Sequence, residues 1–204
     1  MMFPHKLVAT PKASHDMAAA TRTPKAFAQP SRIINQLPLQ HGMRVADFGA
    51  GAGAYTFAMA ENVGPAGHVY AIDVQQDLLS KIKNTAIRDN HKNIDIVWGD
   101  IEKKEGSKLG SASVDMVLVS NTLFQAEHKK NLLQEAKRVL KPGGTLAIID
   151  WAEKGESGKF GPHGAHLVTK ETASALASGA GFAYAREFDA GSHHYGLIYK
   201  RPMA

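Results

Sequence analysis

The chain has 204 residues, the size of one ordinary domain, with 21% charged and 44% hydrophobic residues, as in a typical globular protein. It contains no cysteine, which excludes disulfides, thiolate metal sites and a cysteine nucleophile. The net charge of +5 is uneven, because residues 1–32 hold five basic side chains against Asp16 alone and the remainder is nearly balanced. We therefore expect no basic surface for nucleic acid on the body of the protein.

The N-terminal segment differs from the rest of the chain. Residues 1–30 show little periodicity and are interrupted by Pro4, Pro11 and Pro24, which disfavour a long helix. We interpret 1–30 as a basic arm and 31–204 as a single domain. Neither a signal peptide nor a run of about 20 apolar residues is recognisable, so the sequence predicts a cytoplasmic protein without a membrane span.

Beyond the arm, short apolar runs alternate with segments of helical spacing. The predicted helices cover residues 30–37, 54–61, 76–87, 129–140 and 169–178. The predicted strands cover residues 44–48, 68–72, 94–98, 114–119 and 145–150. Such an alternation is typical of a parallel sheet with helices on both faces.

Two further apolar runs, 182–188 and 193–200, end the chain. The turn residues 189–192 between them predict an antiparallel hairpin. The expected fold class is therefore α/β, with a Rossmann-like, doubly wound, seven-stranded sheet that is mostly parallel and has a C-terminal antiparallel hairpin.

The clearest motif is the set of alternating glycines Gly49, Gly51 and Gly53, between the first strand and the next helix. Glycines at such a turn allow a tight bend and a close approach of the backbone to a ligand. Gly49, Gly51 and Ala54 also satisfy the dinucleotide fingerprint G-x-G-x-x-G/A. The motif alone does not show which of two nucleotide cofactors the loop would bind, or whether it is a turn that binds no ligand.

Asp47 distinguishes between the two cofactors. It lies at the tip of the first strand, two residues before Gly49, and faces whatever the loop binds. A dinucleotide would place its pyrophosphate at the following helix N-terminus, where a carboxylate repels it. S-adenosylmethionine has no phosphate and presents an ammonium and a sulfonium, so Asp47 favours it. A nucleotide-linked oxidoreductase is the weaker alternative.

Two more acids follow the second and third strands. Asp73 and Asp100 therefore lie at the same sheet edge as Asp47, where open α/β sheets bind ligands. Asp73 is placed to bind ribose hydroxyls, although it could equally cap the next helix. Asp100 could accept a hydrogen bond from an adenine amino group, with Val74 and Ile101 as apolar neighbours.

In this order, the motifs resemble the class I S-adenosylmethionine-dependent methyltransferases over roughly residues 30–200. The resemblance is carried by residues 47–53, Asp73, Gly99-Asp100, 113–115 and 138–144. Within that superfamily, the chain is similar to small methyltransferases related to the ubiquinone and menaquinone C-methyltransferases. The stretches that look like this group are 64–70, 149–151, 161–162 and 194–195.

The resemblance implies S-adenosylmethionine as cofactor, S-adenosylhomocysteine as product and a small molecule as methyl acceptor. The expected cofactor-binding residues are Asp47, Gly49, Gly51, Gly53, Tyr55, Asp73, Val74, Gly99, Asp100, Ile101, Ser120 and Asn121. The basic arm has three interpretations: a lid over the cofactor, a tail that binds an acidic partner, or a disordered segment. We favour the lid, because a crevice open to water is unfavourable for methyl transfer.

Candidates for a catalytic role are Asn121, His163 and His166. A general base is needed only if the nucleophile starts protonated, and the two histidines could equally be surface residues of a loop. Phe124 stands where related chains often carry histidine, and residues 121–124 lack the Asn/Asp-Pro-Pro-Tyr run used on base or amide nitrogens. No metal site is expected, and the absence of cysteine argues against thiol-dependent arsenite methylation.

Two other functions stay open from the sequence. The arm could serve an RNA or protein methyltransferase, although the nearly neutral body makes nucleic acid an unexpected partner. The domain could also bind S-adenosylmethionine without catalysis. The sequence does not indicate the methyl acceptor, the methylated atom or the oligomeric state.

Overall fold

The computed structural model describes residues 30–152 and 167–203. Its strands are β1 (Arg44–Phe48), β2 (His68–Asp73), β3 (Ile94–Trp98), β4 (Val114–Ser120), β5 (Leu140–Trp151), β6 (Ala183–Phe188) and β7 (His194–Lys200). Its helices are α1 (Pro30–Ile34), α2 (Ala54–Val63), α3 (Gln76–Arg88), α4 (Lys129–Val139) and α5 (Lys170–Gly179). The predicted arm, 1–30, lies almost entirely outside the described residues, so its boundary and role stay predictions.

The strands form a single seven-stranded sheet in the order β3-β2-β1-β4-β5-β7-β6. The pairs among β1 to β5 are parallel, whereas β7 pairs antiparallel with both β5 and β6. The predicted fold class is confirmed, including the C-terminal hairpin. The order reverses between β1 and β4, and this is where doubly wound sheets open a crevice for a ligand.

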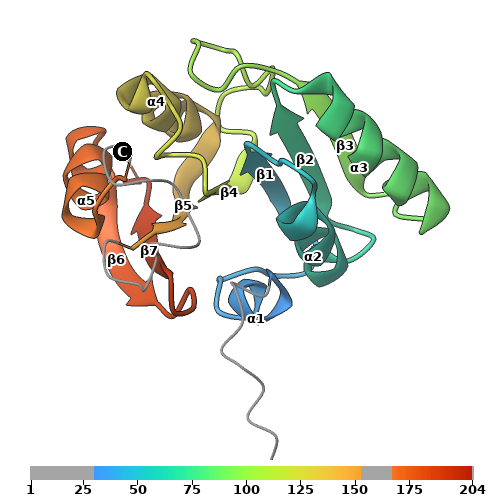
Figure 1. Ribbon diagram of the computed structural model, residues 1–204, viewed down its shortest axis with the longest axis horizontal. Coiled ribbons are helices and arrows are strands. Elements are labelled where there is room, and N and C mark those ends of the chain that lie inside the picture. Colours follow the sequence, from blue (N-terminus) through green and yellow to red (C-terminus); the bar gives the residue numbers. More distant parts are fainter. Residues whose placement is uncertain (1–29, 153–166, 204) are drawn as a thin grey trace, which may run out of the picture.

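Alternating residues of the strands build one core on each face of the sheet. Val45 and Leu118 pack on the face that α1 and α2 cover, while Phe48 and Val117 pack on the face of α4 and α5. Figure 1 shows α2 and α3 beside the β1-β2-β3 half, and α4 and α5 beside the other half. Both faces of the central strands are thus buried, which explains their continuous apolar runs.

The start of β5 departs from the prediction. Helix α4 ends at Val139, and Leu140 already has an extended backbone and pairs with Val114. Residues 141–144 were expected to separate helix from strand, but they form an irregularity within β5, with Gly143 at φ 74° and a register shift beside Val114. Gly143 does adopt a turn conformation, but strand pairing continues on both sides of it, at Leu140 and from Thr145. Helix α1 ends at Ile34, three residues before the predicted end, and the other elements agree with the prediction to within two residues.

Ile33 and Ile34 of α1 are buried, and so is Leu37, just beyond the end of the helix. They pack with Val63 of α2 and anchor the beginning of the domain to the sheet. None of the helices in residues 30–152 and 167–203 combines the length and apolar character that a bilayer crossing requires.

Candidate active site

A cleft of about 570 Å³ opens at the carboxyl ends of β1, β2, β3 and β4. Every predicted cofactor-binding residue except Gly53 lines it. The cleft lies at the reversal of strand order, and its volume falls in the range of small-molecule sites. The fold therefore brings together predicted residues that are up to 74 positions apart, from Asp47 to Asn121.

The glycine loop is fastened to the end of β2. The backbone amides of Gly49 and Ala50 both donate to the carbonyl oxygen of Ile72, at 2.9 and 3.0 Å. Gly51 has φ 55°, and a Cβ placed on it would meet no atom within 4 Å, so its α-carbon faces open space. The loop thus presents bare backbone beside the cleft, which is a suitable surface for a closely bound ligand.

Gly53 has a packing role. It precedes α2 with φ 86°, and a Cβ there would lie 2.8 Å from the Ile82 side chain of α3. Glycine at this position lets the first turn of α2 approach α3. A role in contacting the cofactor stays a prediction.

Asp47 is buried on the cleft wall, only 2% exposed. Its Oδ2 accepts a 2.6 Å hydrogen bond from the hydroxyl of Thr56 in the first turn of α2. Burial raises the pKa of the Asp47 carboxyl to about 6; the Thr56 hydrogen bond opposes this rise and the nearby Asp73 adds to it. A cation in the cleft would stabilise the ionised form of this carboxyl.

Asp73 performs two structural tasks at the end of β2. Its Oδ2 accepts from the amide of Gly51 and its Oδ1 from the amide of Gln75, both at 2.9 Å. Helix α3 begins at Gln76 and has Gln75 as its N-cap, without a side-chain cap, so Asp73 shapes the turn before this helix and does not cap it. Its bond to Gly51 joins the same turn to the glycine loop. A carboxylate has about four acceptor positions, so lone pairs are left for ligand hydroxyls.

Asp100 lines the cleft at the turn after β3. Its Oδ1 accepts from the amide of Glu102 at 3.0 Å, and its Oδ2 pairs with Lys103 Nζ at 3.1 Å. Burial acts to raise the pKa of Asp100, but the bonds from Lys103 and Glu102 hold it below its ordinary value. Ile101 beside it is buried and supplies an apolar surface to the cleft.

Buried polar atoms without a partner gather near the end of β4. The hydroxyls of Tyr55 and Ser120 and Oδ1 of Asn121 are buried and have no hydrogen-bond partner among the described residues. Burial raises the pKa of Tyr55 to about 12, while the nearby Ser120 hydroxyl opposes the rise and Asp47 adds to it. Unpaired buried groups are costly, so these atoms are suited to meeting a ligand.

Asn121 has a left-handed backbone with φ 51°, which is uncommon outside glycine and recurrent at functional sites. Its amide donates to the Ile149 carbonyl at 2.8 Å, which fixes the residue to the end of β5. The other two catalytic candidates, His163 and His166, lie outside the described residues. Among the residues that are described, no group of three or more metal-ligating side chains is assembled.

Several lining residues were not predicted. They are Leu78, Glu102, Thr122, Gln125 and Ala126, together with backbone neighbours of the motifs. Leu78 lies within the predicted helix 76–87, to which no ligand role was given. Thr122, Gln125 and Ala126 belong to the turn after β4, whose path follows from tertiary contacts that no local pattern encodes.

The charge of the cleft is one-sided. Its described lining includes the carboxyl groups of Asp47, Asp73, Asp100 and Glu102 and no lysine, arginine or histidine. A pyrophosphate would meet repulsion without a compensating cation. A cationic ligand with hydroxyl groups matches this wall.

Comparisons with known proteins agree with this geometry. Residues 39–186 match the family model described as a methyltransferase domain. A SAM dependent methyltransferase from Aquifex aeolicus superimposes with a TM-score of 0.78 at 27% identity, covering 86% of this chain and 90% of that one.

Two curated relatives have similar identity. An arsenite methyltransferase of Halobacterium salinarum is 30% identical over 66% of this chain and 32% of its own length. A demethylmenaquinone methyltransferase of Lactococcus lactis subsp. lactis is 31% identical over 53% of this chain and 42% of its own. The chain thus spans less than half the length of these two relatives. By its family model, its fold and its cofactor cleft, the chain belongs to the class I S-adenosylmethionine-dependent methyltransferases.

Proposed function

We propose that this chain transfers a methyl group from S-adenosylmethionine to a small-molecule acceptor. The observation that carries the proposal is the acidic cleft without basic side chains, built around a glycine loop whose backbone is open to a ligand. Bound there, S-adenosylmethionine would supply a methyl group that its sulfonium already activates for displacement.

The residues fit the parts of that cofactor. Asp47 would hold the ammonium group, directly or through water, beside the exposed backbone of Gly51. Asp73 would accept from ribose hydroxyls with the lone pairs that Gly51 and Gln75 leave. Asp100 and Ile101 would receive the adenine, one by hydrogen bonding and one by apolar contact.

The chain's own contribution to the reaction is positioning. In-line displacement gains much of its rate from orientation and from the exclusion of water. Tyr55, Ser120 and Asn121 provide a neutral, buried polar rim at the end of β4, where an acceptor could be oriented. With its pKa raised to about 12, Tyr55 keeps its proton at neutral pH and would act as a hydrogen-bond donor.

A small acceptor is favoured over nucleic acid by charge. The described cleft lining carries no cation to meet a phosphate backbone, and the sequence outside the arm is nearly neutral. The printed names of the relatives, arsenite and demethylmenaquinone methyltransferase, also refer to small acceptors. Because the 204 residues contain no cysteine, a thiol-dependent arsenite route has no ligand in this chain.

The cofactor assignment is tested by titration calorimetry with S-adenosylhomocysteine, S-adenosylmethionine and NAD. We expect the first two to bind and NAD not to bind. Asp47→Ala should weaken both by about tenfold or more, while Asp77→Ala, an exposed aspartate in the first turn of α3, should not. Binding of NAD alone would overturn the proposal.

The acceptor class is tested with a radiolabelled methyl donor and separate pools of phenols and quinols, amines, arsenite, peptides and RNA. Transfer to a small molecule is expected. Transfer only to RNA or peptide would contradict the small-molecule assignment while leaving the cofactor assignment intact.

A further inference from the structure

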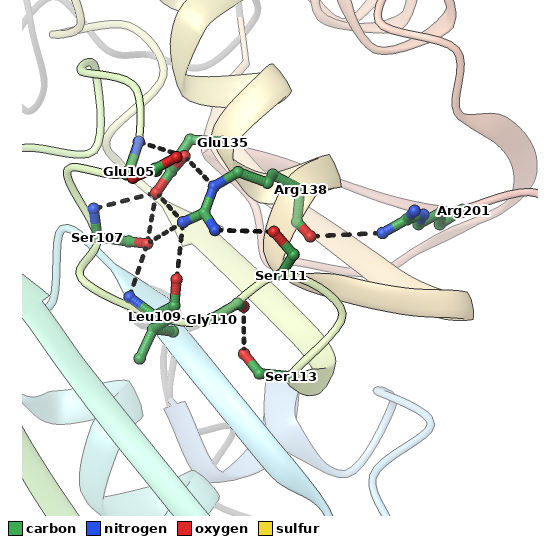
Figure 2. A network of polar contacts seen from close by, with 9 residues as sticks. All are labelled: Glu105, Ser107, Leu109, Gly110, Ser111, Ser113, Glu135, Arg138 and Arg201. Atoms are coloured by element: carbon green, nitrogen blue, oxygen red, sulfur yellow. Dashed lines mark hydrogen bonds and ion pairs between the residues drawn. The ribbon is translucent and has the colours of Figure 1, made fainter.

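The ion pair between Glu135 and Arg138 of α4 is hydrogen-bonded to the loop between β3 and β4. Glu135 is 2% exposed at its side chain and receives two hydrogen bonds from Arg138, at 2.7 and 2.8 Å. It also accepts from the amides of Glu105 and Ser107, each at 3.1 Å, and from the Ser107 hydroxyl at 2.5 Å. Figure 2 shows these side chains converging on the loop, with Arg138 reaching on to the Leu109 carbonyl.

This arrangement, the Glu135 network, keeps the carboxylate ionised. Burial acts to raise the pKa of Glu135, but the hydrogen bonds from Arg138 and Ser107 outweigh it and hold the pKa at about 2. A charge buried this way is costly if one partner is removed, so the network is a fixed feature of the fold at neutral pH.

The two amides that Glu135 binds flank Gly106, and Gly106 packs directly on the cofactor cleft's outer wall. A Cβ on Gly106 would lie 1.9 Å from the Asp100 carbonyl oxygen, and a Cβ on Gly99 would lie 2.3 Å from the Gly106 carbonyl oxygen. The Lys103 amide donates to the Asp100 carbonyl at 3.0 Å, and the Gly106 amide donates to the Lys103 carbonyl at 2.9 Å, so two consecutive turns lead from Asp100 to Gly106. Movement of Gly106 would therefore move the cleft lining.

The backbone of this loop is strained. Glu105, Lys108 and Ala112 all have left-handed backbones, with φ of 58°, 61° and 50°. Such residues persist only where their surroundings hold them in place. The Glu135 network supplies that hold, since it bonds the backbone at Glu105, Ser107 and Leu109.

We propose that Glu135 is a positioning residue for the nucleobase end of the cofactor. Through the amides of Glu105 and Ser107 it seats Gly106 against Gly99 and Asp100, and so fixes the turn that receives adenine. The inference rests on the proposed function, because it assumes that the Asp100 turn contacts the base. Arg138 serves the same role by neutralising Glu135 and binding Leu109.

The test compares two ligands that differ only in the base: S-adenosylhomocysteine and S-ribosylhomocysteine, which lacks adenine. Glu135→Gln should bind S-adenosylhomocysteine about tenfold more weakly and S-ribosylhomocysteine as well as the parent chain does. Hydrogen exchange of the unliganded variant should be faster at residues 99–107. In Glu135→Gln, kcat should equal that of the parent chain, while KM for S-adenosylmethionine should rise.

Arg201→Met is the matched control, because Arg201 binds backbone carbonyls at the end of α4, those of Lys137 at 2.8 Å and Arg138 at 3.4 Å, and has no hydrogen bond to Glu135 or to residues 99–107. Figure 2 shows it reaching the Arg138 carbonyl, away from the Glu135 carboxylate. This variant should lower thermal stability without changing the ratio of the two affinities. If Glu135→Gln does not fold, Ser107→Ala removes the 2.5 Å bond to Glu135 and the longer bonds that Ser107 Oγ accepts from Leu109 and Arg138, at 3.3 and 3.4 Å, but keeps the buried ion pair. It should change the same ratio in the same direction.

Equal weakening of both ligands, or unchanged exchange at 99–107, would overturn the positioning role. Failure of the parent chain itself to bind S-adenosylhomocysteine would instead overturn the proposed function. The two failures are therefore distinguishable within one experiment.

Discussion

The carboxyl group of Asp73 accepts a 2.9 Å hydrogen bond from the backbone amide of Gly51, which joins the end of β2 to the glycine loop after β1. The second oxygen accepts from Gln75, at the start of α3. One side chain thus sets the relative position of two strand ends and a helix start, at the point where the ribose would bind. If the ribose binds here as proposed, ligand binding and local structure are coupled through this residue.

Asp73→Asn should therefore weaken S-adenosylhomocysteine binding by about tenfold or more. The substitution replaces one carboxylate oxygen with an NH2 group, which cannot accept a hydrogen bond, so one of the two backbone amides loses its partner. Calorimetry measures the affinity, and amide exchange of residues 49–53 reports the loop. Asp77→Asn, on the exposed first turn of α3, is the control. An unchanged affinity in Asp73→Asn would show that this carboxyl group contributes to neither loop nor ligand.

Gly49 and Gly51 should respond differently to the same substitution. A Cβ on Gly49 would lie 2.4 Å from Thr122 Oγ1, whereas a Cβ on Gly51 would meet nothing within 4 Å. Both have positive φ, which costs an alanine about 1–2 kcal/mol. We expect Gly49→Ala to lower the thermal midpoint and to lose cofactor binding. Gly51→Ala should lose binding with a smaller loss of stability.

Differential scanning calorimetry and ligand titration of the two variants check this contrast. Thr122→Ala in the Gly49→Ala background should recover part of the stability, because it removes the two nearest atoms of the clash. Equal midpoints for the two single variants would mean that the turn after β4 yields to the added methyl group.

Much of this site could be predicted because its chemistry follows the chain locally. The glycines, Asp47, Asp73 and Asp100 each stand at the end of a strand, and the strand periodicity places these ends at one edge of the sheet. The motif order then matched a known family. Gly53 shows the limit of the pattern, since the same glycine spacing serves helix packing against Ile82 there.

The remaining features arise from contacts between distant segments. Thr122 lines the cleft because its turn packs on Gly49, 73 positions earlier, and no local spacing signals that contact. Similarly, Glu135 lies on the buried side of α4, where an acid contradicts the amphipathic pattern until the loop amides and Arg138 are known. Continuation of β5 through Gly143 depends on pairing with Val114, which the sequence does not display.

Removing the charge of Asp47 should stabilise the protein without cofactor. Its pKa is raised from 3.8 to about 6 on folding, so its stabilising contribution, present below 3.8, is lost as the pH rises through 6. Asp47→Asn avoids this loss and can still accept the Thr56 hydrogen bond. The variant's advantage should grow between pH 4 and 6 and then level at about 3 kcal/mol.

Thermal unfolding of both proteins at pH 4, 6 and 8, without cofactor, measures that advantage. A midpoint difference of several degrees at pH 8 is expected. A constant difference at all three pH values would indicate a packing change in place of the titration of Asp47.

The same titration should make cofactor binding depend on pH in the opposite sense. Below pH 6 the buried Asp47 of the unliganded protein is protonated and cannot pair with an ammonium group, so affinity for S-adenosylhomocysteine should fall by up to about tenfold per pH unit. Between pH 6 and 7.5 the affinity should be nearly constant, because Asp47 is ionised and the ligand's α-amino group keeps its proton. Asp47→Asn should bind weakly with no such dependence.

Burial also raises the pKa of Asp150 to about 6, at the end of β5, where its carboxyl group accepts a hydrogen bond from the amide of Phe124. A pH dependence that survives in Asp47→Asn would therefore assign the effect to Asp150 and contradict the role given to Asp47, whereas its loss in Asp47→Asn and its persistence in Asp150→Asn would locate the ammonium site at Asp47.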